Sequence, residues 1–317
     1  MKSLATKSPL YHFPTQSFFV SLLVVVLAFV SHYKHGGLSI PVIRSITAFS
    51  TLCLITPWLA RYVYITFLRL EHVVDAITES NQHELFSKYE NLAFGLNRWS
   101  VLVTLALIFF AAITNISVWG LNRGSDSITL GILLSLLFGM FGNLGWAYGG
   151  IILFLFKFKT LELDFEPFET KKNEFDKLSS TFLGICIAGV VLYISAIIAG
   201  WLSIGPYLLL IPVLRFWIYP LAIMVIAFFV AVQISLHGIM KKAKDIRINK
   251  IMLLVQKFYR DWEQTQLREK SASINDLLSW REKVEKESDV PFDFITILSL
   301  LVTIVLPLVK SIIDLFR

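Results

Sequence analysis

Long apolar runs constrain the fold of this chain more than any other feature of its sequence. A helix that crosses a bilayer needs about 20 mostly apolar residues, because the hydrocarbon core is about 30 Å thick and each residue rises about 1.5 Å. The stretches that meet or approach this length are 13–30, 40–61, 99–119, 128–156, 180–202, 207–236 and 292–316. Lys310 and Asp314 interrupt the last one. The runs predict an all-α, polytopic transmembrane helical bundle of six or seven spans.

The composition supports a membrane protein, and the absence of several motifs argues against the activities that depend on them. Hydrophobic residues make up 56% of the 317 residues and charged residues 16%, against about 45–50% and about 25% in soluble domains. The sequence contains no His-Glu-x-x-His zinc helix, no Gly-x-Ser-x-Gly elbow, no phosphate-binding Gly-x4-Gly-Lys loop and no Thr-Val-Gly-Tyr-Gly filter. These absences argue against a conventional ATP-driven pump or a metalloprotease. No cofactor is expected, and a protein without enzymatic activity is favoured over an enzyme.

The distribution of basic residues predicts the orientation. The N-terminus and the segments 61–99, 157–180 and 238–292 together hold 23 of the 29 Lys and Arg residues. Basic residues concentrate in cytoplasmic loops. The chain is therefore expected to be a multi-pass protein of the plasma (inner) membrane, with its N-terminus and these three segments in the cytoplasm.

The same pattern divides the chain into three parts. Residues 1–237 are expected to form the transmembrane bundle, with short cytoplasmic helices at 61–99 and 157–180. Within the first of these segments, one continuous helix is expected. Residues 291–317 would be a C-terminal membrane segment. Residues 238–290 should form a cytoplasmic helical hairpin, because apolar residues recur there at helical spacing: Ile248, Ile251, Val255, Phe258 and Trp262. Its apolar face needs a partner, which is either another helix of the chain or another subunit.

The fourth apolar run is rich in glycine: Gly139, Gly142, Gly145 and Gly149, with Asn143 among them. Small residues at this density allow close packing of helix backbones. They could equally line a pore or form a hinge. The amide of Asn143 would lie near mid-span, where it needs a hydrogen-bonding partner.

The sixth apolar run contains the intramembrane cation Arg215, between Pro212 and Pro220. A helix interrupted by proline exposes backbone groups that need a polar lining or a water-filled cavity. Arg215 could attract anions in such a cavity, or it could extend to the outer headgroups. The three residues are therefore further candidates for a pore or hinge.

A polar stripe is predicted on the segment after the second apolar run. His72, Asp75, Glu79 and His83 would share one side of a continuous helix. Histidines and carboxylates on one stripe could bind a divalent metal or relay protons. A solvated helix face gives the same pattern.

Three lysines follow the sixth run at the point where it leaves the membrane: Lys241, Lys242 and Lys244. Basic residues just inside a span attract anionic lipid. They mark the topology, and they are also candidates for a lipid headgroup site.

The C-terminal quarter resembles a group of uncharacterised prokaryotic multi-spanning membrane proteins. The resemblance lies in His237, in Met240-Lys241-Lys242, in Pro291-Phe292-Asp293 and in Pro307. It implies a membrane protein and no defined activity.

Three functions fit these observations. The first is a homo-oligomeric ion channel or pore-like transport protein gated by its cytoplasmic helices. The second is a membrane anchor or signalling component that binds a soluble cytoplasmic protein through residues 238–290. The third is a lipid-acting membrane enzyme that uses the His72–His83 stripe. The expected partners are the lipid bilayer, further copies of the chain and a soluble protein, and a nucleic acid is not expected.

Overall fold

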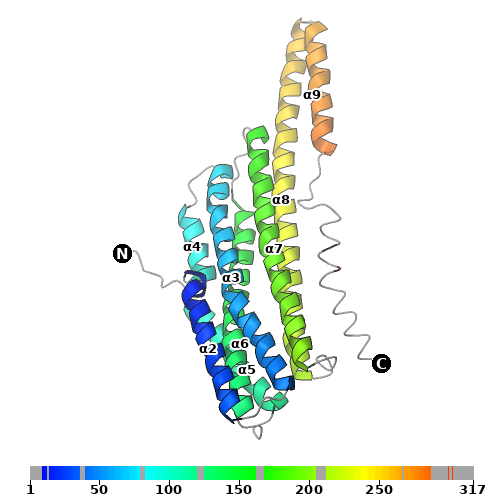
Figure 1. Cartoon of the computed structure of the whole chain (residues 1–317). Helices are drawn as coiled ribbons and strands as arrows, with labels where there is room; N and C mark the ends of the chain where they lie inside the picture. Colours follow the sequence, from blue (N-terminus) through cyan, green and yellow to red (C-terminus); the bar gives the residue numbers. More distant parts are fainter. Residues whose placement is uncertain are drawn as a thin grey trace.

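The computed structural model describes residues 9–12, 14–35, 40–78, 83–119, 125–161, 168–204, 212–265, 268–286, 299 and 302. Nearly all of them are helical, and no β-strand occurs among them. The helices are α1 (Pro9–His12), α2 (Pro14–His35), α3 (Ile40–Ile77), α4 (His83–Phe94), α5 (Arg98–Trp119), α6 (Ser125–Phe158), α7 (Phe168–Ile204), α8 (Pro212–Thr265) and α9 (Arg268–Lys286) (Figure 1).

Four helices in the described part of the chain are long and apolar enough to cross a membrane. The segments that qualify are Ile43–Ile77, Leu130–Phe158, Glu174–Leu202 and Tyr219–Arg260, in α3, α6, α7 and α8. These segments and the all-helical architecture fit the predicted membrane-embedded bundle. Helices α2 and α5 have 22 residues each, or about 33 Å. The count of six or seven spans stays a prediction, because the apolar segments found in α2 and α5, Thr15–Leu27 and Arg98–Ile113, are shorter and 292–316 lies outside the described residues apart from Ser299 and Val302.

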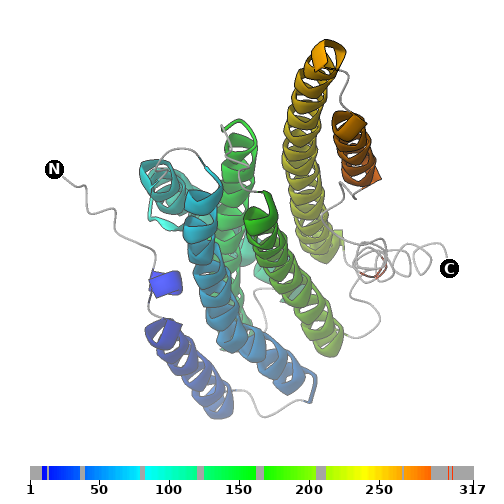
Figure 2. The same cartoon turned by 90° about the horizontal axis from the view of Figure 1, so that it is seen from above.

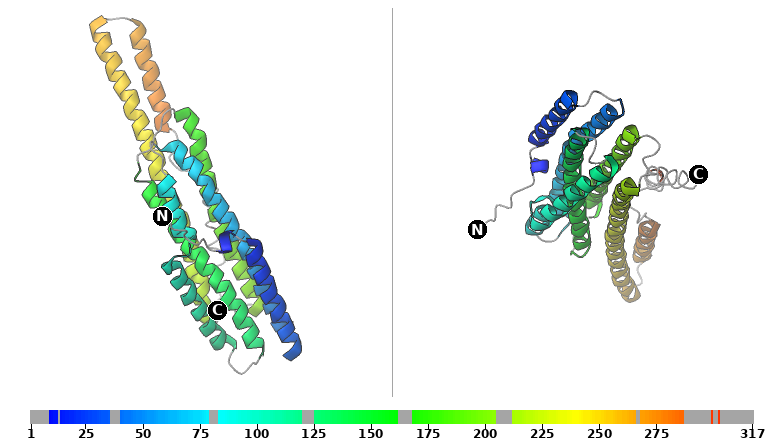
Figure 3. Two further views of the ribbon diagram at one scale, coloured as in Figure 1. Left: turned by 90° about the vertical axis from the view of Figure 1, so that its left-hand side faces the viewer. Right: turned by 90° about the horizontal axis from the view of Figure 1, so that it is seen from below.

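The long helices lie side by side, and the α8–α9 pair projects from one end of the bundle (Figures 1 and 3). We call this the hairpin end and the opposite one the far end. Helix α8 stands at one edge and α2 at the other (Figure 2). The 54 residues of α8 correspond to about 81 Å, far more than the hydrocarbon thickness of about 30 Å. Residues 61–77 and 174–180 continue α3 and α7, and they are not separate short helices.

The single helix predicted for 61–98 is wrong. Helix α3 ends at Ile77, α4 ends at Phe94 and α5 begins at Arg98. Asn97 accounts for the last boundary, because its Oδ1 accepts hydrogen bonds from the backbone N–H groups of Trp99 at 3.1 Å and Ser100 at 2.9 Å. An asparagine in this role caps a helix N-terminus and satisfies donors that have no partner inside the helix.

Three apolar clusters occur among the described residues, and the two larger ones lie toward the two ends of the bundle. The core at the far end joins α2, α3 and α6 through residues such as Val25, Leu52 and Leu133. The core at the hairpin end is aromatic, with Phe67, Phe86 and Phe154 from α3, α4 and α6. Because α4 contributes only to the second core, the region between α3 and α5 completes the hairpin end of the bundle.

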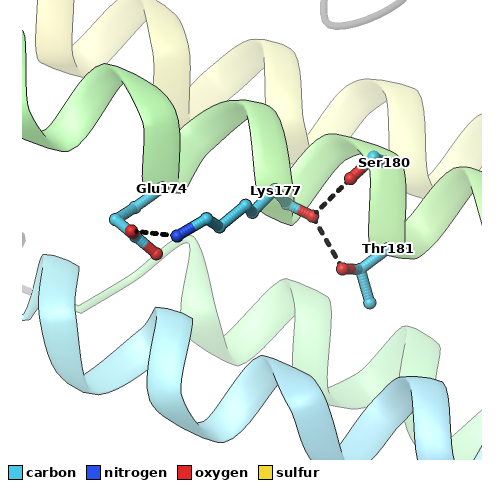
Figure 4. Close-up of polar contacts among 4 residues, drawn as sticks. All are labelled: Glu174, Lys177, Ser180 and Thr181. Atoms are coloured by element: carbon cyan, nitrogen blue, oxygen red, sulfur yellow. Dashed lines mark hydrogen bonds and ion pairs between the residues drawn. The ribbon is translucent and has the colours of Figure 1, made fainter.

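Helix α7 changes from polar to apolar in one turn. The Lys177 ammonium lies 2.6 Å from a Glu174 oxygen, and the Lys177 carbonyl accepts hydrogen bonds from the hydroxyls of Ser180 and Thr181 (Figure 4). Phe182, in the next turn, is fully buried. Hydroxyls that bond to the backbone of their own helix need no other partner. The turn from Lys177 to Thr181 can therefore lie where α7 enters the apolar zone.

Candidate functional site

The glycines of α6 lie against neighbouring helices. A Cβ atom added to Gly139 would lie 3.3 Å from Ile108 Cδ1, and one on Gly142 would lie 3.0 Å from Thr104 Cα, both on α5. One on Gly145 would lie 3.4 Å from the Met224 sulfur on α8, whereas one on Gly149 would meet nothing within 4 Å. Three of the four glycines therefore sit at helix contacts, which favours the close-packing interpretation over a pore wall.

Asn143 links α6 to two other segments. Its amide nitrogen donates to Thr104 Oγ1 at 3.1 Å, and its backbone oxygen accepts from the Tyr11 hydroxyl at 2.8 Å. Tyr11 is fully buried, and its own carbonyl accepts a hydrogen bond from the Arg61 guanidinium at 2.8 Å. The predicted need of the Asn143 amide for a partner is thus met on α5, and α1 is held between α3 and α6.

More contacts reinforce the junction around Tyr11. The Tyr11 ring meets the Phe94 ring edge to face, with centroids 4.9 Å apart, and the Tyr64 hydroxyl donates to Glu90 at 2.8 Å. The Trp146 indole N–H donates to the Leu92 carbonyl at 2.7 Å. Sequence reasoning missed this junction, because its members are up to 132 positions apart and no local pattern relates them.

Replacing Asn143 with alanine is expected to cost about 1 kcal/mol of unfolding free energy, because the Thr104 hydroxyl loses its interhelical partner. Thermal unfolding of the purified protein in detergent would measure the loss. Asn249→Ala, at an exposed position of α8, is the matched control. Equal melting temperatures for the two variants would show that the Asn143–Thr104 bond contributes nothing.

Two buried polar groups without a partner occur on the neighbouring helices α7 and α8. The Tyr193 hydroxyl on α7 and the Gln233 amide nitrogen on α8 have no hydrogen-bond partner. Tyr193 packs against Ala222 and Val225 of α8. A polar group in an apolar zone costs free energy unless it is paired, so this seam between α7 and α8 is a candidate for a hydrated path.

The structure corrects the prediction of an interrupted α8. The helix begins at Pro212 and continues through Pro220 without a break. Proline is favoured in a first helical turn, where its missing N–H needs no partner. Pro220 removes one hydrogen bond, to the carbonyl of Phe216, and it lies on an exposed face. The side chains of Pro212 and Arg215 lie outside the described residues, so the anion-attracting role of Arg215 stays a prediction.

The predicted polar stripe is not continuous. His72 and Asp75 lie on α3, His83 opens α4 after α3 has ended, and Glu79 lies outside the described residues. His83 Nδ1 lies 2.5 Å from a Glu71 oxygen. Within the described ranges no group of three or more His, Cys, Asp or Glu residues could hold a metal ion. The stripe fails because it required one helix from 72 to 83.

Two of the three lysines predicted at the membrane edge make hydrogen bonds within the chain. Lys242 donates to the Leu161 carbonyl at 3.1 Å, and Lys244 donates to the Glu285 carbonyl at 2.7 Å. The first bond ties the end of α6 to α8 and the second ties α9 to α8. Lys241 is exposed on α8.

Helices α8 and α9 pack as an antiparallel pair with exposed apolar flanks. Ile251 and Val284 are buried, and an Arg281 nitrogen lies 3.5 Å from the Met252 sulfur. A hydrogen bond from Lys286 lowers the pKa of Glu282, so this exposed pair stays charged at neutral pH. The large apolar residues left exposed on the pair are Leu253, Leu254, Tyr259, Leu278 and Trp280.

One side of this pair combines apolar and basic residues. The Arg247 guanidinium lies 5.3 Å from the Trp280 ring centroid. Leu254 follows Arg247 by seven positions and therefore shares its face of α8. Lys250 and Lys257 flank Leu254 one turn away in each direction. We call the surface formed by these five residues the hairpin face.

Comparisons with protein-family models, curated proteins and solved structures give no match for this chain. The resemblance carried by His237 and Pro291-Phe292-Asp293 therefore stays a hypothesis.

Proposed function

We propose that this chain is a multi-pass protein of the plasma membrane that binds a soluble cytoplasmic protein at its α8–α9 hairpin. The observation that supports the proposal is the hairpin face, which exposes large apolar side chains at the end of a helix that also crosses the membrane. The N-terminus and the hairpin lie on the cytoplasmic side in this proposal, as the distribution of basic residues favours.

Length places the hairpin face in water. The segment Tyr219–Arg260 has 42 residues, which correspond to about 63 Å. The hydrocarbon core takes about 30 Å of this, so Leu253 and Leu254 lie beyond a bilayer that surrounds the first half of the segment. Leu254 and Trp280, the two apolar residues of the hairpin face, are each 45% exposed. Clustered apolar side chains in water are typical of protein–protein contacts.

The basic residues of the hairpin face indicate which kind of protein would bind there. Arg247, Lys250 and Lys257 surround the apolar residues of the hairpin face, so a partner with an acidic and apolar surface fits best. The partner is therefore expected to be a different protein.

Helix α8 also provides a mechanical link between the membrane and the hairpin. In the apolar zone it packs on α6, where Met224 faces Gly145 and the Phe228 ring meets the Tyr148 ring with centroids 4.7 Å apart. Because the helix continues without a break to Thr265, a shift at this contact would move the hairpin. This supports a role in signalling, in addition to anchoring.

A photo-crosslinking amino acid at position 254 is expected to capture one defined soluble protein in cells. The same probe at position 249, an exposed position of α8 outside the hairpin face, is expected to capture much less. Trp280→Ser should weaken capture at 254, because it removes apolar area from the face. Adducts between copies of this chain alone, or equal capture at both positions, would contradict the proposal.

A homo-oligomeric ion channel is the second candidate. The observation that favours it is two buried polar groups without a hydrogen-bond partner, the Tyr193 hydroxyl on α7, which packs against α8, and the Gln233 amide nitrogen on α8. Intramembrane polar groups are typical of ion pathways. In liposomes holding the purified protein, Gln233→Leu is expected to reduce ion flux at least tenfold, whereas Asn249→Leu is not. Absence of flux with the wild-type protein would exclude this candidate.

A further inference from the structure

We propose that the hairpin-side end of α6 and the adjoining turns of α8 form a binding site for an anionic phospholipid, with Lys157, Lys159, Lys241 and Lys242 around its phosphate group. The site is separate from the hairpin face, so it does not depend on the proposed partner. It also differs from the lysine trio expected from the sequence. Lys244 bonds to the Glu285 carbonyl on the hairpin, away from the end of α6, and Lys157 of α6 and Lys159 just past its end take its place.

Two contacts, one made by Lys159 and one by Lys242, bring the end of α6 against α8. A Cβ atom on Gly238 would lie 2.5 Å from Lys159 Cε, so the Lys159 side chain runs directly along the α8 backbone. Four residues later Lys242 donates to the Leu161 carbonyl at 3.1 Å. The end of α6 therefore touches α8 over one helical turn. All four lysines are exposed, so this turn presents four ammonium groups to the surroundings.

The depth of this turn matches a headgroup layer. Gly238 lies 26 positions after Pro212, the first residue of α8, which corresponds to about 39 Å along the helix. A bilayer has a hydrocarbon core of about 30 Å and a total thickness of about 40–45 Å. A span that begins near Pro212 thus places Gly238 among the headgroups on the hairpin side.

Each helix also presents an apolar surface next to its lysines. Leu153 lies one turn before Lys157 on the same face of α6, and Ile234 lies two turns before Lys241 on the same face of α8. Leu153 is 54% exposed and Ile234 is 52% exposed. An acyl chain along these residues would leave its phosphate beside the lysines. This arrangement fits a phospholipid better than it fits free phosphate.

The binding strength can be estimated from the charges. A basic residue close to an anionic headgroup contributes about a fivefold gain in affinity. Removing two of the four ammonium groups is therefore expected to weaken binding about 25-fold. Phosphatidylcholine carries no net charge and is expected to bind much more weakly than phosphatidylglycerol.

The test uses the purified full-length protein in detergent, titrated with phosphatidylglycerol, phosphatidylcholine or inorganic phosphate. Native mass spectrometry counts the bound lipid. Wild-type protein should bind phosphatidylglycerol preferentially. The Lys159→Gln and Lys241→Gln double variant should bind it about 25-fold more weakly. A double variant on the hairpin outside the hairpin face, Arg260→Gln and Lys283→Gln, loses the same charge at exposed positions and should bind as the wild type does.

Three results would overturn the proposal. Equal losses in both double variants would show attraction to overall charge alone. Equal binding of phosphatidylcholine would show that the net negative charge of the headgroup is irrelevant, and competition by inorganic phosphate at the lipid's concentration would assign the site to free phosphate. If the Lys159→Gln and Lys241→Gln variant unfolds, Lys159→Arg with Lys241→Arg serves instead. It keeps the charge and should retain the lipid, and loss of lipid from a folded arginine variant would also overturn the proposal.

Discussion

Replacing Gly150 with alanine is expected to lower the unfolding free energy by about 1–3 kcal/mol, and replacing it with leucine should lower it further. A Cβ atom at this position would lie 2.6 Å from both Cα and Cβ of Ala93 on α4. Backbone atoms cannot rotate away as a side chain can, so α4 must shift off α6. The shift would also disturb the hydrogen bond from Trp146 to the Leu92 carbonyl.

The neighbouring residue provides the control for this substitution. Gly149 lies on the same helix, and an added Cβ would meet nothing within 4 Å. Gly149→Ala is therefore expected to be neutral or to stabilise the protein by up to about 1 kcal/mol, because alanine favours the helix. Thermal unfolding of the Gly150→Ala and Gly149→Ala variants in detergent would measure the difference in their stability. Equal melting temperatures would mean that α4 does not pack on α6 at Gly150.

Replacing Phe67 with alanine is expected to cost about 3–5 kcal/mol, which is typical when a large aromatic side chain is removed from a core. Phe67 is fully buried. Its ring stacks on Phe86 with centroids 4.9 Å apart and meets Phe94 and Phe154 at 5.2 and 5.4 Å. Because these rings come from α3, α4 and α6, the cavity would loosen three helices at once.

An exposed phenylalanine provides the comparison. Phe109 on α5 is 65% exposed, so Phe109→Ala is expected to change the unfolding free energy by less than about 1 kcal/mol. Chemical denaturation of the two variants in the same detergent would measure both values. A cost for Phe67→Ala no greater than that for Phe109→Ala would contradict an aromatic core at the hairpin end.

The apolar runs were sufficient to predict the four membrane-length helices α3, α6, α7 and α8, because a bilayer imposes a minimum length that can be read from the sequence alone. They could not reveal how far the helices continue. Residues 61–77 of α3 alternate charged positions such as Arg69 with buried ones such as Phe67 and Leu70. That pattern fits a separate amphipathic helix as well as a continuation, and packing against α4 and α6 decides between them.

The polar contacts were less predictable than the helices. The glycine spacing in α6 indicated close packing, but only the structure identifies α5 and α8 as the helices that pack there. Nothing local indicates that Tyr11 bonds to the backbone of residue 143. The polar stripe from His72 to His83 was wrong because a period of 3.6 residues holds only while the helix lasts, and α3 ends at Ile77.

Nitroxide labels placed one at a time along α8 test the central claim most directly, which is that one helix runs from the lipid into water. Labels at Ile223, Val230 and Ile234 in the reconstituted protein should be relaxed mainly by oxygen, which concentrates in lipid. Labels at Asn249, Leu253 and Lys257 should be relaxed mainly by a water-soluble nickel complex. Nickel access at all six positions, or oxygen-dominated relaxation at Leu253 and Lys257, would contradict it.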